Sequence, residues 1–237
     1  SAFEGYARAF RDRRDRALFQ VHIGADYGGG AYGWTTDASV AIPQFEERLR
    51  TLGTDYADFG FIHCIDEDAD FDAVMNGGIW DYACRMKQEG VILHLGFSTH
   101  SAHIARRFIA TGVMDMGMFS LNPMYDYTDE SEYGQGTADD RAALYREFEA
   151  AGVGISVMKP FAGGQLLDAQ TSPFGEALTR TQCIQYALDK PGVLTVLPGV
   201  RGLGDLHDVL AYLDASPEQR DYSAIGRFAP PEASGRC

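Results

Sequence analysis

A histidine ends one of the most apolar stretches of this chain. The run Tyr56–His63 is followed at once by the acidic segment Asp66–Asp68. Imidazole is the side chain that most readily exchanges a proton near neutral pH, so His63 is a candidate for polarising or protonating a substrate. A second histidine, His22, lies at the end of the earlier apolar run Ala17–Ile23. The two histidines are the candidate catalytic residues.

Polar residues also follow the later apolar runs of the chain. The candidates for binding a ligand are Ser98, Thr99, Asn122, Lys159, Gly199 and Arg201. The carboxyl ends of parallel strands meet at one edge of a sheet or barrel, where ligands bind. Any one of these residues could be an ordinary polar group of a loop. Taken together, they indicate a ligand-binding site at the carboxyl ends of the strands.

Three glycine-rich segments differ in what they could bind. Pro198–Gly204 combines backbone N–H groups, Arg201 and the start of a helix, which suits a phosphate group or a phosphorylated cofactor. Phe161–Gly164 is either a flexible loop that closes over a ligand or an ordinary turn. Tyr27–Gly33 has neither the phosphate-loop pattern nor the dinucleotide pattern, and we predict a mobile loop there.

Composition excludes several classes of function. The formal net charge of −14 argues against nucleic acid and anionic membrane surfaces as partners, because both require clustered lysine and arginine. His63, Asp66 and Asp68 lack the spacing of a metal site, so we predict no metal. The four cysteines (Cys64, Cys84, Cys183 and Cys237) show no CxxC spacing, which indicates a cytoplasmic protein without a disulfide framework.

Strand-like and helix-like segments alternate along the chain. Most of the predicted helices stop at a glycine, such as Gly53 or Gly90, just before an apolar run. This alternation predicts an α/β fold with a parallel sheet of six strands. It leaves two architectures open, a doubly wound open sheet and a (β/α)8 barrel that lacks two strands. Helices are expected at Phe3–Phe10, Phe174–Leu188 and Leu206–Leu213, and a long polar loop at Asp126–Asp139.

Several motifs, in this order, resemble those of the aldo/keto reductase family. Leu52–His63 reads LGTDYADFGFIH and is similar to the family signature LGTDYIDLYLLH. Gly90–Ser98 reads GVILHLGFS, similar to GKIRHIGFS, and the likeness continues through Asn122-Pro123, Gly152–Gly164 (GVGISVMKPFAGG) and Val196–Arg201 (VLPGVR). The resemblance runs from about Phe3 to Leu213.

The resemblance implies a TIM barrel that uses NADP(H) to reduce aldehydes and ketones. It assigns His63 to the family's catalytic histidine, Ser98 and Thr99 to the pair that holds the nicotinamide carboxamide, and Arg201 to the position that binds the 2′-phosphate. We expect Asn122, Lys159 and Gly199 to complete the cofactor site.

The chain departs from the family pattern at several positions. His22 stands where the family has a lysine, Met118 lies near the position of the nicotinamide-binding glutamine, and Met158 near that of the stacking aromatic residue. The family's catalytic aspartate and tyrosine would lie upstream of residue 1. An imidazole is charged only below a pH of about 6.5, so we expect weak carbonyl reduction that rises below pH 7.

The ends of the chain suggest a shortened protein. We expect a partial barrel over residues 1–221, without the first two strands. A tail follows at 222–237, like the one that leads into the iron–sulfur domain of some family members, where Cys237 could be a cluster ligand. Open barrel edges could support self-association. The alternatives to a carbonyl reductase are a module that binds NADP(H) without turnover, an inactive fragment, and a flavodoxin-like binding domain.

Overall fold

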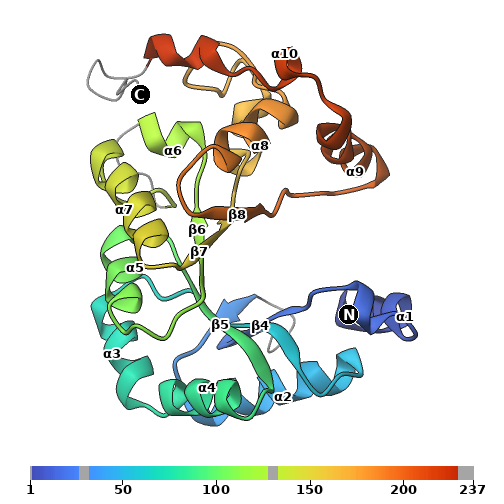
Figure 1. Ribbon diagram of the computed structural model, residues 1–237, viewed down its shortest axis with the longest axis vertical. Helices are drawn as coiled ribbons and strands as arrows, with labels where there is room; N and C mark the ends of the chain where they lie inside the picture. Colours follow the sequence, from blue (N-terminus) through green and yellow to red (C-terminus); the bar gives the residue numbers. More distant parts are fainter. Residues whose placement is uncertain (1, 27–31, 128–132, 229–237) are drawn as a thin grey trace. The chain divides into compact units, whose positions relative to one another are not determined.

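The computed structural model describes residues 2–26, 32–127 and 133–228, and six of its strands form one sheet (Figure 1). The strands are β1 (Gln20–Ile23), β4 (Ala57–Ile62), β5 (Ile92–Thr99), β6 (Met116–Ser120), β7 (Gly154–Met158) and β8 (Val193–Val196). The helices are α1 (Ala2–Phe10), α2 (Ala38–Leu52), α3 (Asp68–Asn76), α4 (Ile79–Gln88), α5 (Ala102–Ile109), α6 (Pro123–Tyr127), α7 (Ala138–Ala150), α8 (Arg180–Leu188), α9 (Leu203–Leu210) and α10 (Pro217–Arg220).

The order of the strands decides between the two predicted architectures. It is β1-β4-β5-β6-β7-β8, so neighbours in the sheet are also neighbours along the chain. A doubly wound sheet reverses its strand order at a switch point, whereas a (β/α) barrel does not. The parallel, sequential order is that of an aldo/keto-reductase-type barrel sheet, which confirms the predicted fold class. Two short strands, β2 (Ala25–Asp26) and β3 (Gly33–Trp34), form a separate antiparallel pair.

The chain divides into two compact units. The first comprises Ser1–Thr99 with His103–Gly117, and the second His100–Ala102 with Met118–Cys237. In the first unit, β4 pairs in parallel with both β1 and β5. Helix α2 packs against β1 and α4 against β5 (Figure 1). Fully buried aromatic side chains, among them those of Phe45, Phe61, Phe97 and Phe108, fill the core.

Two glycines inside the strands of the first unit make this packing feasible. A Cβ atom on Gly60 would lie 2.4 Å from the Ile92 side chain, and one on Gly96 would lie 2.4 Å from the Phe61 ring. Glycine in a strand often marks such a close approach, because any other residue would displace the neighbour. The large side chains of Phe61 and Ile92 therefore lie across the adjacent strands.

Helix termini follow the predicted pattern. Gly53 ends α2 with a left-handed φ of 69°, and its N–H donates to the carbonyl of Arg50. Glycines with similar φ angles follow α4, α5 and α7, at Gly90, Gly112 and Gly152. Residues with a Cβ rarely adopt this conformation, which is why glycine was an informative stop signal.

A buried polar network anchors the second unit. The Arg141 side chain is fully buried and donates to a carboxylate oxygen of Asp126 at 2.9 Å and to the carbonyl of Ser120 at 2.5 Å. The Tyr145 and Tyr186 hydroxyls also donate to Asp126, at 2.6 and 2.8 Å. These bonds tie α6, α7 and α8 together. Breaking such a pair from one side costs about 3–5 kcal/mol, because a buried charge is left alone.

Several apolar side chains of the second unit are exposed to solvent. Leu194 on β8 is 69% exposed, Leu203 at the start of α9 is 75% exposed, and Leu213 shortly after α9 is 71% exposed. Val200 and Leu210 are also exposed. In the described residues, no helix combines the length and the apolar character needed to cross a membrane.

Some elements differ from the sequence predictions. Helix α3 was not expected. The helix predicted at Phe174–Leu188 begins only at Arg180, because Thr179 forms a capping box with Gln182. The last predicted helix begins earlier, at Leu203, and its end at 211–214 is a 3-10 turn. The loop predicted at Asp126–Asp139 overlaps the end of α6, and its residues 128–132 lie outside the described part.

Candidate active site

The two predicted catalytic histidines, His22 and His63, lie side by side in the first unit. His22 lies in β1 and His63 follows β4, and these two parallel strands are neighbours with Ile23 opposite Ile62. The Nδ1 atoms of the two rings lie 2.7 Å apart, within hydrogen-bonding distance. The rings are nearly perpendicular, with an interplanar angle of 81°. The pairing of the strands thus brings together two residues that are 41 positions apart in sequence.

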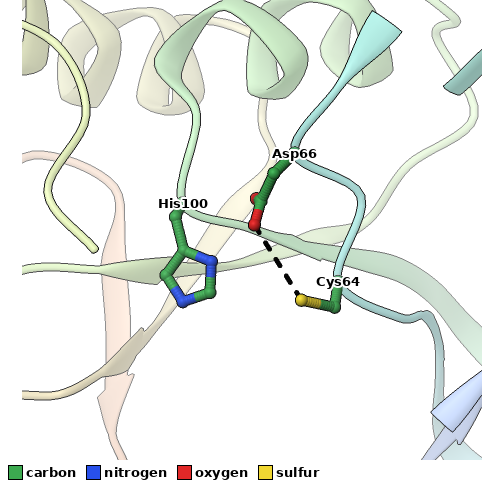
Figure 2. A group of neighbouring side chains, drawn as sticks. All are labelled: Cys64, Asp66 and His100. Carbon is green, nitrogen blue, oxygen red and sulfur yellow. Dashed lines mark hydrogen bonds between the residues drawn. The ribbon is translucent and has the colours of Figure 1, made fainter. Parts of the chain in front are cut away.

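Ser98 and Thr99, at the end of β5, lie beside the histidine pair. The Ser98 hydroxyl accepts the N–H of Cys64 at 2.8 Å and lies 3.4 Å from Nδ1 of His63. The Thr99 hydroxyl donates to the carboxylate of Asp66 at 3.0 Å. That carboxylate also accepts a weak bond of 3.9 Å from the Cys64 thiol, as Figure 2 shows. His63, Ser98 and Thr99 therefore belong to one connected group in the first unit.

His22 is neutral in this environment. Its pKa is lowered from the usual 6.5 to about 3, mainly by burial and in addition by the nearby His63 ring and the Arg48 guanidinium. Arg48, itself buried, donates to the carbonyl of His22 at 2.8 Å and to that of Ala25. The expectation that His22 becomes charged just below pH 7 is therefore wrong, because removing the ring from water penalises the imidazolium form.

The predicted binding residues of the second unit are also connected. The Asn122 side chain donates to the carbonyl of Lys159 at 2.8 Å, and its oxygen accepts the N–H of Tyr125 at 3.0 Å. Lys159 has a left-handed φ of 57°, which the amide of Asn122 helps to hold. The Lys159 ammonium lies 3.1 Å from Nε2 of His100 and over the ring of Tyr133.

Strained backbone is concentrated at the ends of the strands. The described residues other than glycine that have positive φ are Cys64, Lys159 and Ala162, at 53°, 57° and 48°. Cys64 directly follows His63, and Lys159 directly follows β7. Such conformations cost of order 1–3 kcal/mol each and are found preferentially at functional sites. Their positions support a functional role for these two strand ends.

The two glycine-rich loops of the second unit line a common pocket of about 420 Å³. Phe161 and Gly163 contribute from one loop, and Gly199 and Arg201 from the other. Lys159 and Arg180 also line the pocket, so three cationic side chains surround it. The volume lies within the usual range for small-molecule sites, which is about 300–1,000 Å³.

Carboxylates partly neutralise these cations. Arg180 forms ion pairs with Asp205 at 2.6 Å and with Asp208 at 2.9 Å. Asp205 also accepts the backbone N–H of Arg201 at 3.0 Å, and this bond is the main reason why the Asp205 pKa is lowered. The Arg201 side chain is 93% exposed and lies 3.6 Å from Asp205. An anionic ligand in this pocket would compete with Asp205.

Each unit holds residues that sequence reasoning missed. Tyr32 and Gln20 bond to the histidine pair in the first unit. In the second unit, Arg180 lines the pocket and pairs with Asp205. Two other predictions fall outside the described residues: the iron–sulfur role of Cys237, and the part of the mobile loop at 27–31.

Comparison with known proteins agrees with this picture. The family model described as "Aldo/keto reductase family" matches residues 6–181. This match spans most of the chain, and the chain therefore belongs to the aldo/keto reductase family, whose members are oxidoreductases. A comparison with curated protein sequences finds no match.

Solved structures show the same fold. An aldo-keto reductase from Bacillus halodurans in its holo form has a TM-score of 0.74 and 19% identity, over 96% of this chain and 78% of that one. An aldo/keto reductase from Klebsiella pneumoniae, in complex with NADP and acetate, has a TM-score of 0.63 and 20% identity, over 98% of this chain and 77% of that one.

Proposed function

We propose that this chain is an NADP(H)-dependent reductase of aldehydes and ketones. The observation that carries the proposal is the hydrogen-bonded pair of His22 and His63 at the ends of two adjacent strands. His63 is half-buried, and a ring in this position can take part in acid–base catalysis at a substrate carbonyl. A hydrogen bond to that carbonyl polarises it and stabilises the negative charge that develops on its oxygen.

The second unit supports the choice of cofactor. Bound NADPH would supply a hydride to the substrate carbon. The pocket of Lys159, Gly199 and Arg201 offers cationic groups and backbone amides, the chemistry that a phosphate requires. The structure of the Klebsiella pneumoniae relative contains NADP. We assign Arg201 to the 2′-phosphate, and Ser98 and Thr99 to the nicotinamide carboxamide.

A specific observation favours a second candidate, a module that binds NADP(H) without turnover. His22 stands where the family resemblance places a lysine, and its depressed pKa leaves it without charge near pH 7. A neutral ring cannot replace the electrostatic effect of an ammonium group. The two candidates differ in turnover but share the cofactor pocket.

A pair of measurements separates these candidates. Titration with NADPH, followed by its fluorescence, reports binding, and absorbance at the NADPH band during incubation with a panel of aldehydes reports turnover. Binding together with aldehyde-dependent consumption supports the reductase. Binding without consumption supports the module, and the absence of binding overturns both.

We also propose that the protein works in the cytoplasm. The cysteines are scattered without CxxC spacing, a pattern typical of proteins of a reducing compartment. Determining the location of a tagged copy in fractionated cells tests this assignment.

A further inference from the structure

A second pocket, of about 420 Å³, lies in the first unit beside β1. Its volume is within the usual range for small-molecule sites, which is about 300–1,000 Å³. The residues that line it are Phe3, Tyr6, Phe10, Ala17, Leu18, Phe19, Gln20, His22 and Leu52. Residues 17–20 precede β1 or begin it, whereas the candidate active site lies at the carboxyl ends of the strands. The pocket is therefore a separate site, and His22 is the residue that connects it to the histidine pair.

Aromatic side chains of α1 form one wall of this pocket. Phe3, Tyr6 and Phe10 have the spacing i, i+3 and i+7, so they lie on one side of the helix. Helix α1 packs against α2, yet none of the residues described in α1 is buried. The Phe10 ring packs edge-on against that of Phe19, with 5.8 Å between the ring centroids. An aromatic ligand that displaced water from this wall would gain the free energy of burying apolar surface.

The hydrogen-bonding groups of the pocket come from β1. Gln20 and His22 are alternate residues of the strand, so their side chains point to the same face. Nε2 of Gln20 lies 2.7 Å from Nε2 of His22. A side-chain amide has an acceptor oxygen and two N–H donors, so Gln20 can bond to His22 and to a ligand at the same time. The pocket therefore matches an aromatic ligand that carries one polar group.

The charges around the pocket favour an uncharged ligand. Among the described residues that line it, none is an aspartate, glutamate, lysine or arginine, and His22 is neutral at pH 7. Two arginines lie close to the wall, and both already have partners. Arg14 lies 4.4 Å from the centroid of the Phe19 ring and pairs with Asp58 at 2.7 Å. Arg48 lies 5.9 Å from the centroid of the Phe3 ring and donates to two backbone carbonyls. A charged ligand would lose its hydration here without gaining an ion pair.

We propose that this pocket binds a small, uncharged aromatic molecule that carries one hydrogen-bonding group. The ring of the ligand lies against the aromatic side of α1, and its polar group bonds to the Gln20 amide. Since His22 lines the pocket and lies 2.7 Å from His63, the ligand also alters the surroundings of the histidine pair. Binding at this site does not depend on carbonyl reduction and can be measured without turnover.

A matched pair of fluorescent probes tests the proposal. N-phenyl-1-naphthylamine is uncharged and aromatic, has one N–H group, and becomes fluorescent in apolar surroundings. The probe 8-anilino-1-naphthalenesulfonate differs from it by one sulfonate. We expect the uncharged probe to bind with a Kd lower by about tenfold or more, because the pocket offers the sulfonate no free cation. In ¹⁵N-histidine NMR spectra, the uncharged probe should shift the ring resonances of His22.

Variants of the lining locate the probe. Ala17→Phe fills part of the pocket and should raise the Kd of the uncharged probe about tenfold or more. Ala110→Phe, at an exposed position that does not line the pocket, is the control. Tyr6→Ser removes a ring from the wall at a residue that is 54% exposed, and it should raise the Kd in a chain that still folds. Leu203→Ser, in the second unit, should leave the Kd unchanged.

Four results would overturn the proposal. The first is a Kd of the uncharged probe that is the same in Ala17→Phe, Tyr6→Ser and the unmodified chain. The second is loss of binding in Leu203→Ser, which would locate the probe on the exposed leucines. The third is equal affinity for the two probes, and the fourth is a His22 resonance that does not respond to the uncharged probe. None of these results bears on whether the chain reduces carbonyl compounds.

Discussion

The two units hold their candidate residues in different ways. In the first unit, the His63 side chain contacts those of His22 and Ser98, and burial keeps His22 neutral near neutral pH. In the second unit, the cations of the pocket contact other groups: Arg180 pairs with carboxylates, and Lys159 lies over a tyrosine ring.

The difference predicts two kinds of sensitivity. Short hydrogen bonds between neutral groups depend on geometry. Small changes in the positions of these groups should therefore weaken the bonds strongly, whereas salt should affect them little. The Arg201 and Asp208 side chains are mostly exposed, and ion pairs of exposed groups are weak and screened by salt, so the pocket should respond to charge and to ionic strength. The following variants test whether this contrast holds, from the largest expected effect to the smallest.

Replacement of His63 should have the largest effect. We expect His63→Gln to lower turnover by about 10²–10⁴-fold, because positioned acid–base groups contribute effects of this size. Affinity for NADPH should not change, since the cationic pocket keeps its residues. His103→Gln is the control, because its exposed ring pairs with Asp68 instead. Equal turnover in both variants would contradict the assignment.

Acid should destabilise the fold through His22. Its pKa is about 3 in the folded chain and near 6.5 when unfolded, so between these values the unfolded chain binds a proton that the folded chain does not. The free energy of unfolding should therefore fall as the pH drops through this window, by at most about 1.4 kcal/mol per pH unit. Urea denaturation at pH 7 and pH 5 measures the effect.

A variant isolates this contribution. His22→Gln removes the titrating ring, so its loss of stability between pH 7 and pH 5 should be smaller than that of the unmodified chain. His103→Gln again serves as the control. Identical pH dependence in the unmodified chain and in His22→Gln would show that the His22 ring is not excluded from water.

Loss of Arg201 should weaken cofactor binding moderately. We expect Arg201→Ala to raise the Kd for NADPH about tenfold, equivalent to about 1.4 kcal/mol, and to leave NADH binding unchanged. Higher salt should shrink the difference, because this side chain is exposed. Arg50→Ala, which removes an exposed arginine of α2, is the control. Fluorescence titration at two salt concentrations decides the outcome.

Removal of the Asp205 carboxylate, which would compete with an anionic ligand, should have the smallest effect. It should strengthen the binding of NADPH, whereas loss of Arg201 weakens it. Asp205→Asn eliminates the anion that pairs with Arg180 and accepts from Arg201, so the Kd for NADPH should fall a few-fold. The isosteric Asp208→Asn should lower the Kd for NADPH by a smaller factor, because Asp208 bonds only to Arg180 among the arginines of the pocket. An increase in Kd for Asp205→Asn would mean that this carboxylate positions Arg201.

The main elements of the fold and part of the candidate site could be predicted from the sequence. His63 and Ser98 could be predicted because an apolar run that ends in a polar residue indicates the end of a parallel strand. Helix α3 was missed because Glu67, at its start, forms no side-chain cap and the acidic segment resembles a loop. Helix α8 begins later than predicted because its capping box at Thr179 was not recognised within the longer apolar pattern.

Tyr32 and Gln20 could not be predicted in the same way. Tyr32 belongs to a glycine-rich loop that has no periodicity, and its partner lies 31 residues away. Gln20 is the first residue of β1 and follows an apolar run, and only its hydrogen bond to His22 gives it a role. The protonation state of His22 depends on the surrounding packing, which a sequence pattern does not contain.

The exposed leucines of β8 and α9 have a consequence for the behaviour of the protein in solution. With a formal net charge of −14, copies of the chain repel one another at low ionic strength. Added salt shortens the range of this repulsion, and sulfate also strengthens the association of apolar surfaces. Solubility should therefore decrease as ammonium sulfate is added, and Leu203→Ser, which replaces an exposed apolar side chain with a polar one, should raise the concentration at which precipitation begins.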